Sequence, residues 1–276
     1  MIELPEAVTL AAQASELVVG RVITAAEAGH TPHRLTWFTG EPSDYRAALT
    51  GRTLTGASAV GGHVVLEAGE VRVVLSDAAV PRRHAPGERL PDRHQLRLDL
   101  DDGAALVVTV AMYGGIELLR DGDAGSPYLA AARRAPSPLT AAFDADWFAG
   151  LLAADGVGRL SAKAFLATEQ RVPGLGNGVL QDVLWVAGIH PRRKVATLSD
   201  AERAALHSAV TGTLRAMADA GGRDTERDLR GRPGRYPTVM CRGTLHLPCP
   251  RCGGPRSKEA YLGGSVYVCA ACQPLG

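Results

Sequence analysis

The sequence lacks any run of about 18 consecutive apolar residues, so it contains no segment expected to cross a membrane as a helix. Basic residues are missing from the first positions, which instead include Glu3 and Glu6, and this argues against a secretory signal. Disorder is excluded, since 46% of the residues are hydrophobic and 21% are charged. No internal repeat is evident. We expect a cytoplasmic globular protein without a membrane partner, with one large or two modest domains in its 276 residues.

Lysine is scarce, since the 30 basic residues comprise 3 lysines and 27 arginines. Arginine suits bidentate contacts with phosphate, but a GC-rich coding bias produces the same excess, and composition leaves both explanations open. The net charge of +1 is unevenly distributed. Residues 1–200 carry 19 basic and 23 acidic side chains, whereas residues 201–276 carry 11 and 6. This basic C-terminal part favours an anionic partner.

Hydrophobic patterning predicts a β-rich first half with one helix at its front. Residues 5–19 have apolar side chains at helical spacing, and Pro5 suits a first helical turn. Between residues 22 and 119 the apolar runs are short, with strands indicated at 71–75, 95–100 and 106–110. Asp-Gly and Gly-Gly pairs separate these runs. The pattern is typical of a β-sandwich or barrel-like domain.

Helical patterning follows a stretch rich in glycine, serine and proline. Helices are expected at residues 143–154, 162–171, 178–187 and 200–220. The sequence therefore predicts an α+β multidomain chain. Its parts are a β domain at residues 1–120, a linker at 121–140, a helical domain at 141–240 and a cysteine-bearing tail at 241–276.

Cysteine is also scarce, and four of the five cysteines occur as two pairs in the tail. Cys249 and Cys252 form the first C-x₂-C pair, and Cys269 and Cys272 form the second after a gap of 16 residues. This spacing predicts a zinc site, in which four thiolates bind Zn²⁺ tetrahedrally. Disulfides are disfavoured in a chain without an export signal. Cys241 lies outside the pattern, and we expect it to be a buried thiol rather than a ligand.

The segment between the two cysteine pairs predicts a β-hairpin. Apolar residues 260–262 and 266–268 flank Gly263 and Gly264, which are suited to a tight turn between antiparallel strands. A zinc-bound hairpin is commonly only a scaffold, so this feature on its own indicates no chemistry.

A turn rich in proline and glycine separates the helices expected at 162–171 and 178–187. Pro173 ends the first helix, and the glycines allow positive φ and close backbone approach. Asn177 is placed to cap the second helix. The exposed N–H groups of such a turn form a seat for a phosphate. An ordinary helical hairpin is the alternative, and the turn alone favours it.

Three motifs occur in the order found in one family. Glu3-Leu4-Pro5-Glu6, the turn from Glu169-Gln170 to Asn177 and the four-cysteine tail ending in Gln273 resemble the formamidopyrimidine-DNA glycosylase / endonuclease VIII family of base-excision repair enzymes. The resemblance covers essentially the whole chain. It implies an N-terminal β-sandwich, a helix–two-turn–helix DNA-binding domain and a C-terminal zinc β-hairpin finger. It also implies a monomer, located with the bacterial nucleoid, that binds double-stranded DNA containing damaged bases or abasic sites between its domains.

The resemblance assigns catalysis to the first residues. In that family the amine of an N-terminal proline attacks C1′ of the damaged nucleotide, and the next residue, a glutamate, is the general acid/base. Glu3 matches this glutamate, and Glu6 matches a second one. Ile2 replaces the proline, and because Met1 is normally removed only before small residues, we expect Met1 to be retained. The amine is then displaced by about 3 Å.

The resemblance also assigns DNA-binding residues. Asn177 resembles the family's phosphate-binding asparagine, and Lys163 and Gly176 are expected at the same surface. Met112 resembles the methionine that fills the gap left by a flipped-out base, although for Met112 alone core packing is the simpler interpretation.

Two further positions depart from the family pattern. A lysine expected just before residues 64–67 is absent, and Gly61, Gly62 and His63 stand there. The finger tip, where the family has an arginine, contains Gly263 and Gly264. Losing that arginine removes a phosphate contact of about 1.5–3 kcal/mol.

These observations leave competing hypotheses. The first is a repair glycosylase with impaired or absent AP lyase activity, in which Glu3 activates water, or the amine of Met1 or a trimmed Ile2 attacks. The second is a non-catalytic binder of damaged or abasic DNA, and the third is a zinc protein that binds RNA or another protein. Retention of Glu3 and Glu6 favours the first, and the three departures favour the second. Residues 222–236 match either a lesion-contacting loop or a solvated, flexible one, so the lesion is not identified.

Overall fold

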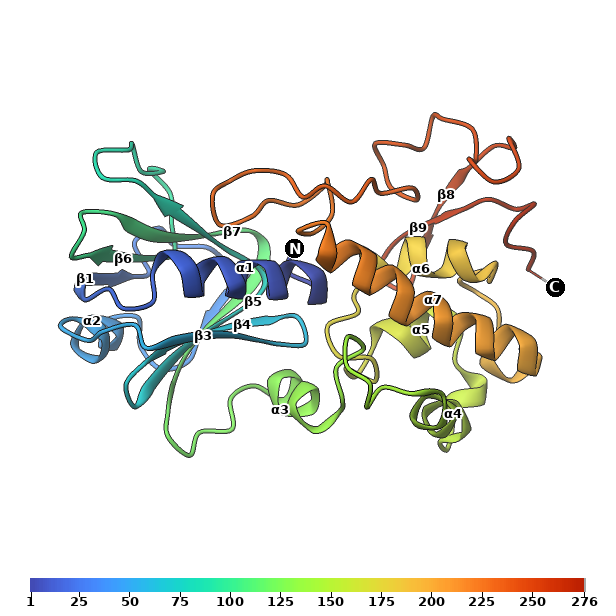
Figure 1. The fold of residues 1–276 in the computed structure, drawn as a ribbon, viewed down its shortest axis with the longest axis horizontal. Helices are drawn as coiled ribbons and strands as arrows, with labels where there is room; N and C mark the ends of the chain where they lie inside the picture. The colour runs from blue at the N-terminus through green and yellow to red at the C-terminus, as the bar shows by residue number, and fades with distance from the viewer. Residues whose placement is uncertain (276) are drawn as a thin grey trace.

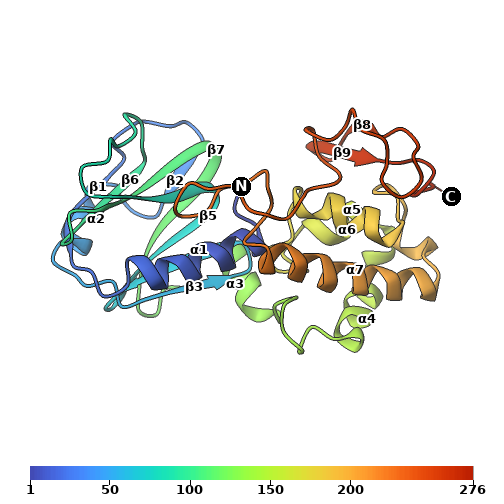
Figure 2. The ribbon, with the colours of Figure 1, turned by 45° about the horizontal axis from the view of Figure 1, so that its top comes forward.

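The computed structural model describes residues 1–275, which form two halves along the long axis of the molecule (Figure 1). The N-terminal half is a folded β-sheet with a helix lying along it, and the C-terminal half consists of helices beside a small β-hairpin (Figure 2). Within residues 1–275, every helix is too short or too polar to span a bilayer.

The β half is built on one hydrogen-bonded sheet with the strand order β1-β6-β7-β5-β4-β3, in which β2 adds to β7. A short helix, α2 (Asp44–Leu49), follows β2 in the chain. The strands are β1 (Ile23–Ala28), β2 (Thr36–Phe38), β3 (Gly56–Val60), β4 (His63–Ala68), β5 (Val71–His84), β6 (Leu96–Leu100) and β7 (Ala105–Arg120).

The long strands β5 and β7 belong to both layers of the sandwich. The first part of β5 pairs with β4 and with residues 114–120 of β7, whereas residues 79–84 pair with residues 105–110. The register shifts between Asp77 and Ala79, and such a bulge bends the strands. Aliphatic side chains from both layers form one buried core. The predicted β-sandwich is confirmed, although β5 and β7 are far longer than expected.

Helix α1 (Leu4–Leu17) confirms the helix expected at residues 5–19. Pro5 needs no partner in the first turn, and the Glu3 N–H donates to the Glu6 carboxylate at 3.3 Å. The apolar face of α1, including Leu10 and Ala14, packs into the core of the β half. This packing holds Glu3, at the start of the helix, at the boundary between the two halves.

The helical half confirms the expected helices, with changes at their ends. Leu166, Leu180 and Leu214 belong to its separate buried core. The elements are α4 (Ala145–Ala153), α5 (Ala162–Ala167), α6 (Val179–Ala187), α7 (Asp200–Asp219) and the hairpin of β8 (Ser257–Tyr261) and β9 (Gly264–Val268).

Helix α5 is four residues shorter than expected. Glu169 and Gln170 adopt positive φ of 59° and 53°, which a right-handed helix does not allow. The Gln170 side chain accepts a hydrogen bond from the Gly174 N–H at 2.9 Å. The chain therefore turns before Pro173, and the turn itself, rather than the proline, ends the helix.

A helix also lies in the segment expected to be a linker. Helix α3 (Pro127–Arg134) begins with Ser126, whose hydroxyl accepts the Leu129 N–H at 3.3 Å, and with proline in its first turn. Leu129 is fully buried beside Leu119 at the end of β7. The linker prediction missed α3 because the flanking glycines and prolines hide a capped helix of two turns.

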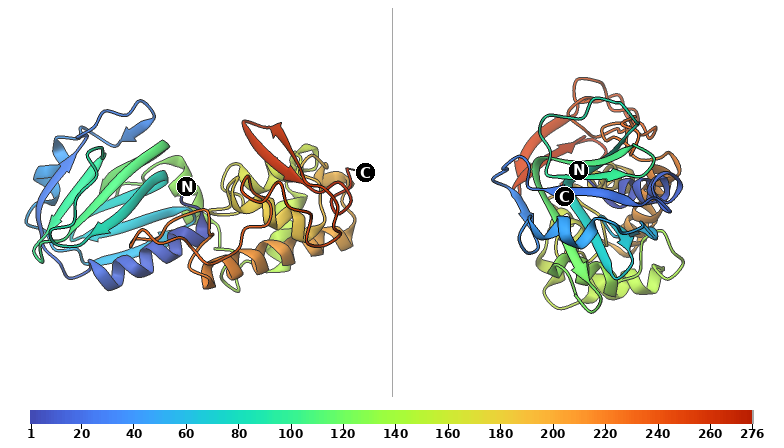
Figure 3. Two further views of the ribbon diagram at one scale, coloured as in Figure 1. Left: turned by 90° about the horizontal axis from the view of Figure 1, so that it is seen from above. Right: turned by 90° about the vertical axis from the view of Figure 1, so that its left-hand side faces the viewer.

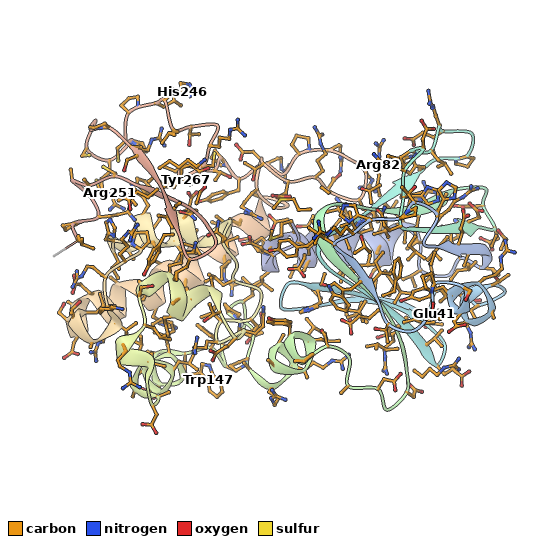
Figure 4. All side chains as sticks on the ribbon, turned by 180° about the vertical axis from the view of Figure 1, so that it is seen from behind. Glu41, Arg82, Trp147, His246, Arg251 and Tyr267 are labelled. Atoms are coloured by element: carbon orange, nitrogen blue, oxygen red, sulfur yellow. The ribbon has the colours of Figure 1, made fainter. Side chains whose placement is uncertain are left out.

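Helices α1 and α7 lie nearly end to end along one side of the molecule (Figure 3). The chain that leaves α7 returns over the β half, where the Arg83 N–H donates to the Leu229 carbonyl at 2.8 Å. Leu229 is 1% exposed and belongs to the core of the β half. Arg82, labelled in Figure 4, lies against Gly231 of the same segment. Residues 222–236 are therefore anchored to the β half at Leu229, although several of their side chains are exposed.

Candidate active site and nucleic-acid interface

A cleft of about 1050 Å³ lies between the two halves. Residues 1–3, Trp37 and the Met112-Tyr113 pair line it from the β half. Residues 174–177 line it from the helical half, and the hairpin tip at residues 262–265 closes one side. Tyr267 of β9, labelled in Figure 4, contributes from the same hairpin. The cleft thus brings the first residues of the chain together with the turn before α6.

Glu3 is only 3% exposed and lies where this cleft meets the helical half. Its carboxylate accepts backbone N–H groups from Val179 at 2.7 Å, Gly178 at 2.8 Å and Gly176 at 3.3 Å. The first N–H groups of a helix have no hydrogen-bond partner within the helix, and the helix dipole favours a negative charge beside them. A side chain distant in sequence therefore caps α6.

Asn177 was expected to cap α6, and this prediction is wrong. The cap position is Gly178, and the Asn177 side-chain nitrogen instead donates to the Ser265 carbonyl of the hairpin at 3.2 Å. Lys163 is also turned toward the hairpin, where its ammonium donates to the Tyr261 carbonyl at 2.6 Å. Burial lowers the pKa of Lys163. Both residues line the cleft as expected, but they also hold the hairpin tip against the helical half.

Arg223 joins the two glutamates of the opening motif. Its guanidinium donates to Glu6 at 2.9 and 3.0 Å and lies 3.8 Å from the Glu3 carboxylate. Its backbone N–H also donates to Glu6, at 3.1 Å. All three side chains are at most 5% exposed. Arg223 is the critical member of this set, because removing it leaves two buried carboxylates without a cation.

The N-terminal backbone is also held in place. The Ile2 N–H donates to the Asp77 carbonyl at 2.5 Å, and the Ile2 side chain is 4% exposed in the core of the β half. The Met1 ammonium forms an ion pair with Glu226. The Met1 amine is thus paired with the segment that follows α7. The nitrogen of Ile2 is an amide whose hydrogen is already bonded to the Asp77 carbonyl.

The carboxyl groups around the cleft have perturbed acidities. Burial raises the pKa of Glu3, which Arg223 opposes and Glu6 reinforces. Burial also raises the pKa of Asp77, which lines the cleft. Asp77 adopts a left-handed φ of 58° at the bulge in β5, a conformation found at strained functional positions. A raised pKa brings a carboxyl group closer to the range useful for general acid–base chemistry.

Met112 is 60% exposed at the rim of the cleft, beside Tyr113 at 42% and across from the helical half. Core packing is therefore excluded for Met112. Trp37 also lines this rim, and its indole lies so close to Gly115 that no Cβ fits there. The β2–β7 pairing that brings Trp37 to the rim depends on this glycine.

In the segment where the family pattern has a lysine, the backbone lies in close contact with the turn before α6. Gly61 and Gly62, in the turn between β3 and β4, lie against Gly174, where an added Cβ would be 2.5 Å from Gly61 and 2.6 Å from Gly62. Gly174 has a φ of 74°, which favours glycine. Gly176 contacts Glu3 in the same way, with 2.9 Å between a built Cβ and the carboxyl carbon. Glycines at this boundary let the turn, the N-terminus and the β half meet.

The four cysteines of the tail lie together at the end of the hairpin. The sulfur atoms of Cys249 and Cys272 are 3.8 Å apart, and those of Cys252 and Cys269 are 3.4 Å apart. A tetrahedral zinc ion with bonds of about 2.3 Å requires thiolates about 3.8 Å apart, so the cluster fits zinc. Cys241 lies outside the cluster and is half-buried rather than buried.

Arg223 and Asp77 are site residues that the sequence did not single out. Arg223 is one of five arginines in residues 222–236, and only the docking of α7 against α1 distinguishes it. Asp77 interrupts an apolar strand, which is the one sequence signal that marks it. Both depend on contacts between segments that are distant in the chain.

Comparison with known proteins agrees with this architecture. Residues 1–144 match the model of the formamidopyrimidine-DNA glycosylase N-terminal domain, and residues 135–227 match the model of the formamidopyrimidine-DNA glycosylase H2TH domain. The formamidopyrimidine-DNA glycosylase of Roseiflexus sp. (strain RS-1) is 31% identical, over 99% of this chain and 100% of the relative. The formamidopyrimidine-DNA glycosylase of Symbiobacterium thermophilum is 30% identical, over 100% of this chain and 90% of the relative.

Solved structures share the fold. The MutM (Fpg) protein from Thermus thermophilus superposes with a TM-score of 0.82 at 25% identity, over 99% of each chain. The Lactococcus lactis Fpg in complex with abasic-site DNA also gives a TM-score of 0.82 at 25% identity, over 98% of this chain and 99% of that one.

Proposed function

Since the chain belongs to the formamidopyrimidine-DNA glycosylase family, we propose that it is a base-excision repair glycosylase that releases a damaged base with weak or absent AP lyase activity. The main support for this proposal is the difference between the Glu3 carboxylate, which faces the cleft, and the N-terminal nitrogen atoms. Glu3 is a preorganised carboxylate beside the cleft, whereas the Ile2 nitrogen is an amide bonded to Asp77 and the Met1 ammonium is paired with Glu226. These contacts support a role for Glu3 as the acid–base group, and with Met1 retained they leave no free amine at residue 2.

Release of the base then proceeds by attack of water. Glu3 takes a proton from a water molecule whose oxygen forms a bond to C1′ of the damaged nucleotide. The N-glycosidic bond breaks, and its electron pair leaves with the base. The raised pKa of Glu3 suits this role, because a stronger base accepts the proton more readily.

Double-stranded DNA with a damaged base or an abasic site is the proposed partner. Relatives of known structure bind DNA with an abasic site or a damaged base. We propose that Met112, which is exposed at the cleft, fills the gap left by a flipped base, and that Asn177, Lys163 and Gly176, which line the cleft, contact the DNA backbone. We also propose that Cys249, Cys252, Cys269 and Cys272 hold one Zn²⁺, which stabilises the hairpin and takes no part in the reaction.

A non-catalytic binder of damaged or abasic DNA is the second candidate. Both oxygens of Glu3 already accept backbone hydrogen bonds, and Arg223 stabilises its charge. With both oxygens already engaged, neither is free to take a proton from water unless one of these hydrogen bonds is given up. This observation favours binding without bond cleavage.

Single-turnover assays on duplexes with one oxidised purine, formamidopyrimidine or oxidised pyrimidine distinguish the candidates. We expect base release that falls at least about 100-fold in Glu3→Gln, with DNA binding retained. Glu16→Gln, an exposed position on the same helix, is the matched control and should keep full activity. Binding of abasic duplex without release of any of these bases by the unmodified protein would support the second candidate.

Borohydride trapping tests the lyase proposal separately. The unmodified protein should yield little covalent complex with abasic DNA, with intact mass used to establish whether Met1 is present. Ile2→Pro allows Met1 removal and supplies a secondary amine whose hydrogens still reach the Asp77 carbonyl, so trapping should increase. Efficient trapping by the unmodified protein would contradict the proposal.

A further inference from the structure

A cluster of metal-ligating side chains lies away from the cleft, at the β1–β6 edge of the sheet. Glu27 belongs to β1, His30 follows that strand, and His94 precedes β6, which pairs with β1. Figure 1 shows β1 and β6 side by side at the end of the molecule opposite the hairpin. One ligand atom from each of the three residues lies within 4.8 Å of the others. This cluster takes no part in the proposed function.

His94 is oriented like a ligand. Its ring is 5% exposed, and Nδ1 lies 3.3 Å from the Pro91 carbonyl, which can only accept a hydrogen bond. Nδ1 therefore carries a proton, and in the neutral imidazole the lone pair is on Nε2. A backbone carbonyl that fixes the second nitrogen in this way is the usual support of a metal-bound histidine. Nε2 is buried, has no hydrogen-bond partner among the described residues, and faces Glu27 Oε2 at 3.5 Å.

Among residues 1–275, Glu27 pairs with the two imidazoles and with no arginine. Its other oxygen lies 3.0 Å from His30 Nδ1. Arg97 is directly opposite Glu27 in the β1–β6 register but donates to Asp99 at 2.7 Å. In the neutral tautomer, the His94 lone pair and the Glu27 carboxylate face each other at 3.5 Å, an arrangement that a metal ion between them satisfies.

The spacing suits a small divalent ion after a modest closure. Two nitrogens and one oxygen at about 2.0–2.2 Å from a tetrahedral zinc ion lie about 3.4 Å apart, so the cluster must close by about 1 Å. His30 and Glu27 are 44% and 45% exposed and can rotate, whereas His94 is fixed. The His30 and His94 rings are stacked, with centroids 4.3 Å apart, so the mobile ring is already close to the fixed one.

We propose that Glu27, His30 and His94 form a second metal site, for a divalent transition ion of the zinc class. Two imidazoles and one carboxylate favour such an ion over calcium or magnesium, which prefer all-oxygen sites. Three protein ligands leave a further position for water or an exogenous ligand. Binding also joins the segment that leads to β2, and so to Trp37 at the cleft, with the segment before β6.

Equilibrium dialysis of the full chain against micromolar Zn²⁺, followed by elemental analysis, tests this site. The unmodified protein should bind one zinc per chain more than His94→Gln or His30→Gln, a difference that does not depend on the occupancy of the cysteine cluster. His33→Gln, at a half-buried histidine outside the cluster, is the matched control and should match the unmodified protein. Because His30 is exposed, its variant should fold normally even if His94→Gln does not.

Equal zinc content in the unmodified protein and in a folded His30→Gln variant would overturn the proposal. Nitrogen-15 NMR of the histidine rings gives a second readout. Zinc should shift the His94 Nε2 resonance while Nδ1 remains protonated. An imidazolium at His94 that is protonated on both nitrogens at neutral pH and unchanged by zinc would show that a proton, rather than a metal, neutralises Glu27.

Discussion

At the scale of residues, Arg223 and the two glutamates Glu3 and Glu6 form the centre of the site. The family motif accounts for the glutamates, but their buried charges are stable only because one guanidinium lies between them. The same arginine also approaches the Met1 carbonyl, at 3.4 Å. One side chain therefore links the candidate acid–base group to the position of the N-terminus.

Replacing Arg223 with methionine should destabilise the protein strongly. We expect the free energy of unfolding to fall by about 3–5 kcal/mol at pH 7, because Glu3 and Glu6 are left buried without a cation. A carboxyl group whose pKa is higher in the folded than in the unfolded protein destabilises the fold when it is ionised. The stability lost in the variant should therefore become smaller as pH falls toward the ordinary glutamate range. Urea unfolding at pH 7 and pH 5 measures both effects.

Arg230→Met is the control for this change. Arg230 lies in the same segment and pairs with the exposed Glu16, so its loss should cost less than about 1 kcal/mol at either pH. A similar loss in both variants would contradict the special role of Arg223.

At the scale of elements, the N-terminus of α6 and the hairpin decide the shape of the site. Helix α6 has no cap from its own turn, and Glu3 supplies one from α1. The hairpin in turn fastens to the helical half through Asn177, Lys163 and Gln181, whose side-chain oxygen accepts the Tyr267 N–H at 3.0 Å. The cleft is therefore assembled from three elements that carry no common sequence motif.

Gly178→Ala should weaken this assembly. A Cβ at this position would meet the Arg223 guanidinium and lie 2.7 Å from the Glu3 carboxylate, so we expect a loss of about 1–3 kcal/mol and reduced DNA binding. Gly212→Ala in α7 is the control, since nothing lies within 4 Å of its added Cβ. That change should stabilise the protein by about 0.5–1 kcal/mol. Thermal unfolding that moves in the same direction for both would rule out the close contact.

Chelation of zinc should disorder the tail before the helical half. The Trp185 indole lies 3.4 Å from the Cys249 sulfur and beneath the Arg251 guanidinium, so its fluorescence reports on the cluster. We expect a chelator to change this fluorescence while far-UV circular dichroism, dominated by the helices, is largely retained. Trp185→Phe should abolish the fluorescence change. Unaltered fluorescence after complete removal of metal would contradict the assignment.

At the scale of the whole molecule, the cleft between the halves is poor in cations. Among the described residues that line it, Lys163 is the one lysine or arginine side chain, while Glu3 and Asp77 are acidic. Arginines of the C-terminal part are instead paired with acidic groups elsewhere, as Arg230 is with Glu16 and Arg232 with Asp228. The net basic charge of residues 201–276 is therefore less available to DNA than composition indicates.

Binding of abasic duplex should therefore depend only modestly on salt. The slope of log K against log salt is about −0.9 for each phosphate neutralised, and we expect a total of about −1 to −3. Titrations at several salt concentrations measure it, and Lys163→Gln should make the slope shallower by about one. Slopes steeper than about −5 would show that arginines outside the cleft dominate binding.

The amino-acid sequence by itself determined the β-sandwich, the helical half, the zinc-type hairpin and the family glutamates. Their signals are local: strand alternation, helical periodicity, the spacing of cysteines, and a short motif at Glu3 and Glu6. Each depends on residues close together in the chain, where backbone geometry translates spacing directly into position.

Only the tertiary structure decided what those residues do together. Glu3 rather than Asn177 caps α6, Arg223 is set apart from four neighbouring arginines, and residues 222–236 pack against the β half. Each depends on contacts between segments that lie as far apart as α1 and the end of α7. Burial and electrostatic pairing in three dimensions determine which of several chemically equivalent side chains takes a given role, and no local sequence pattern predicts this.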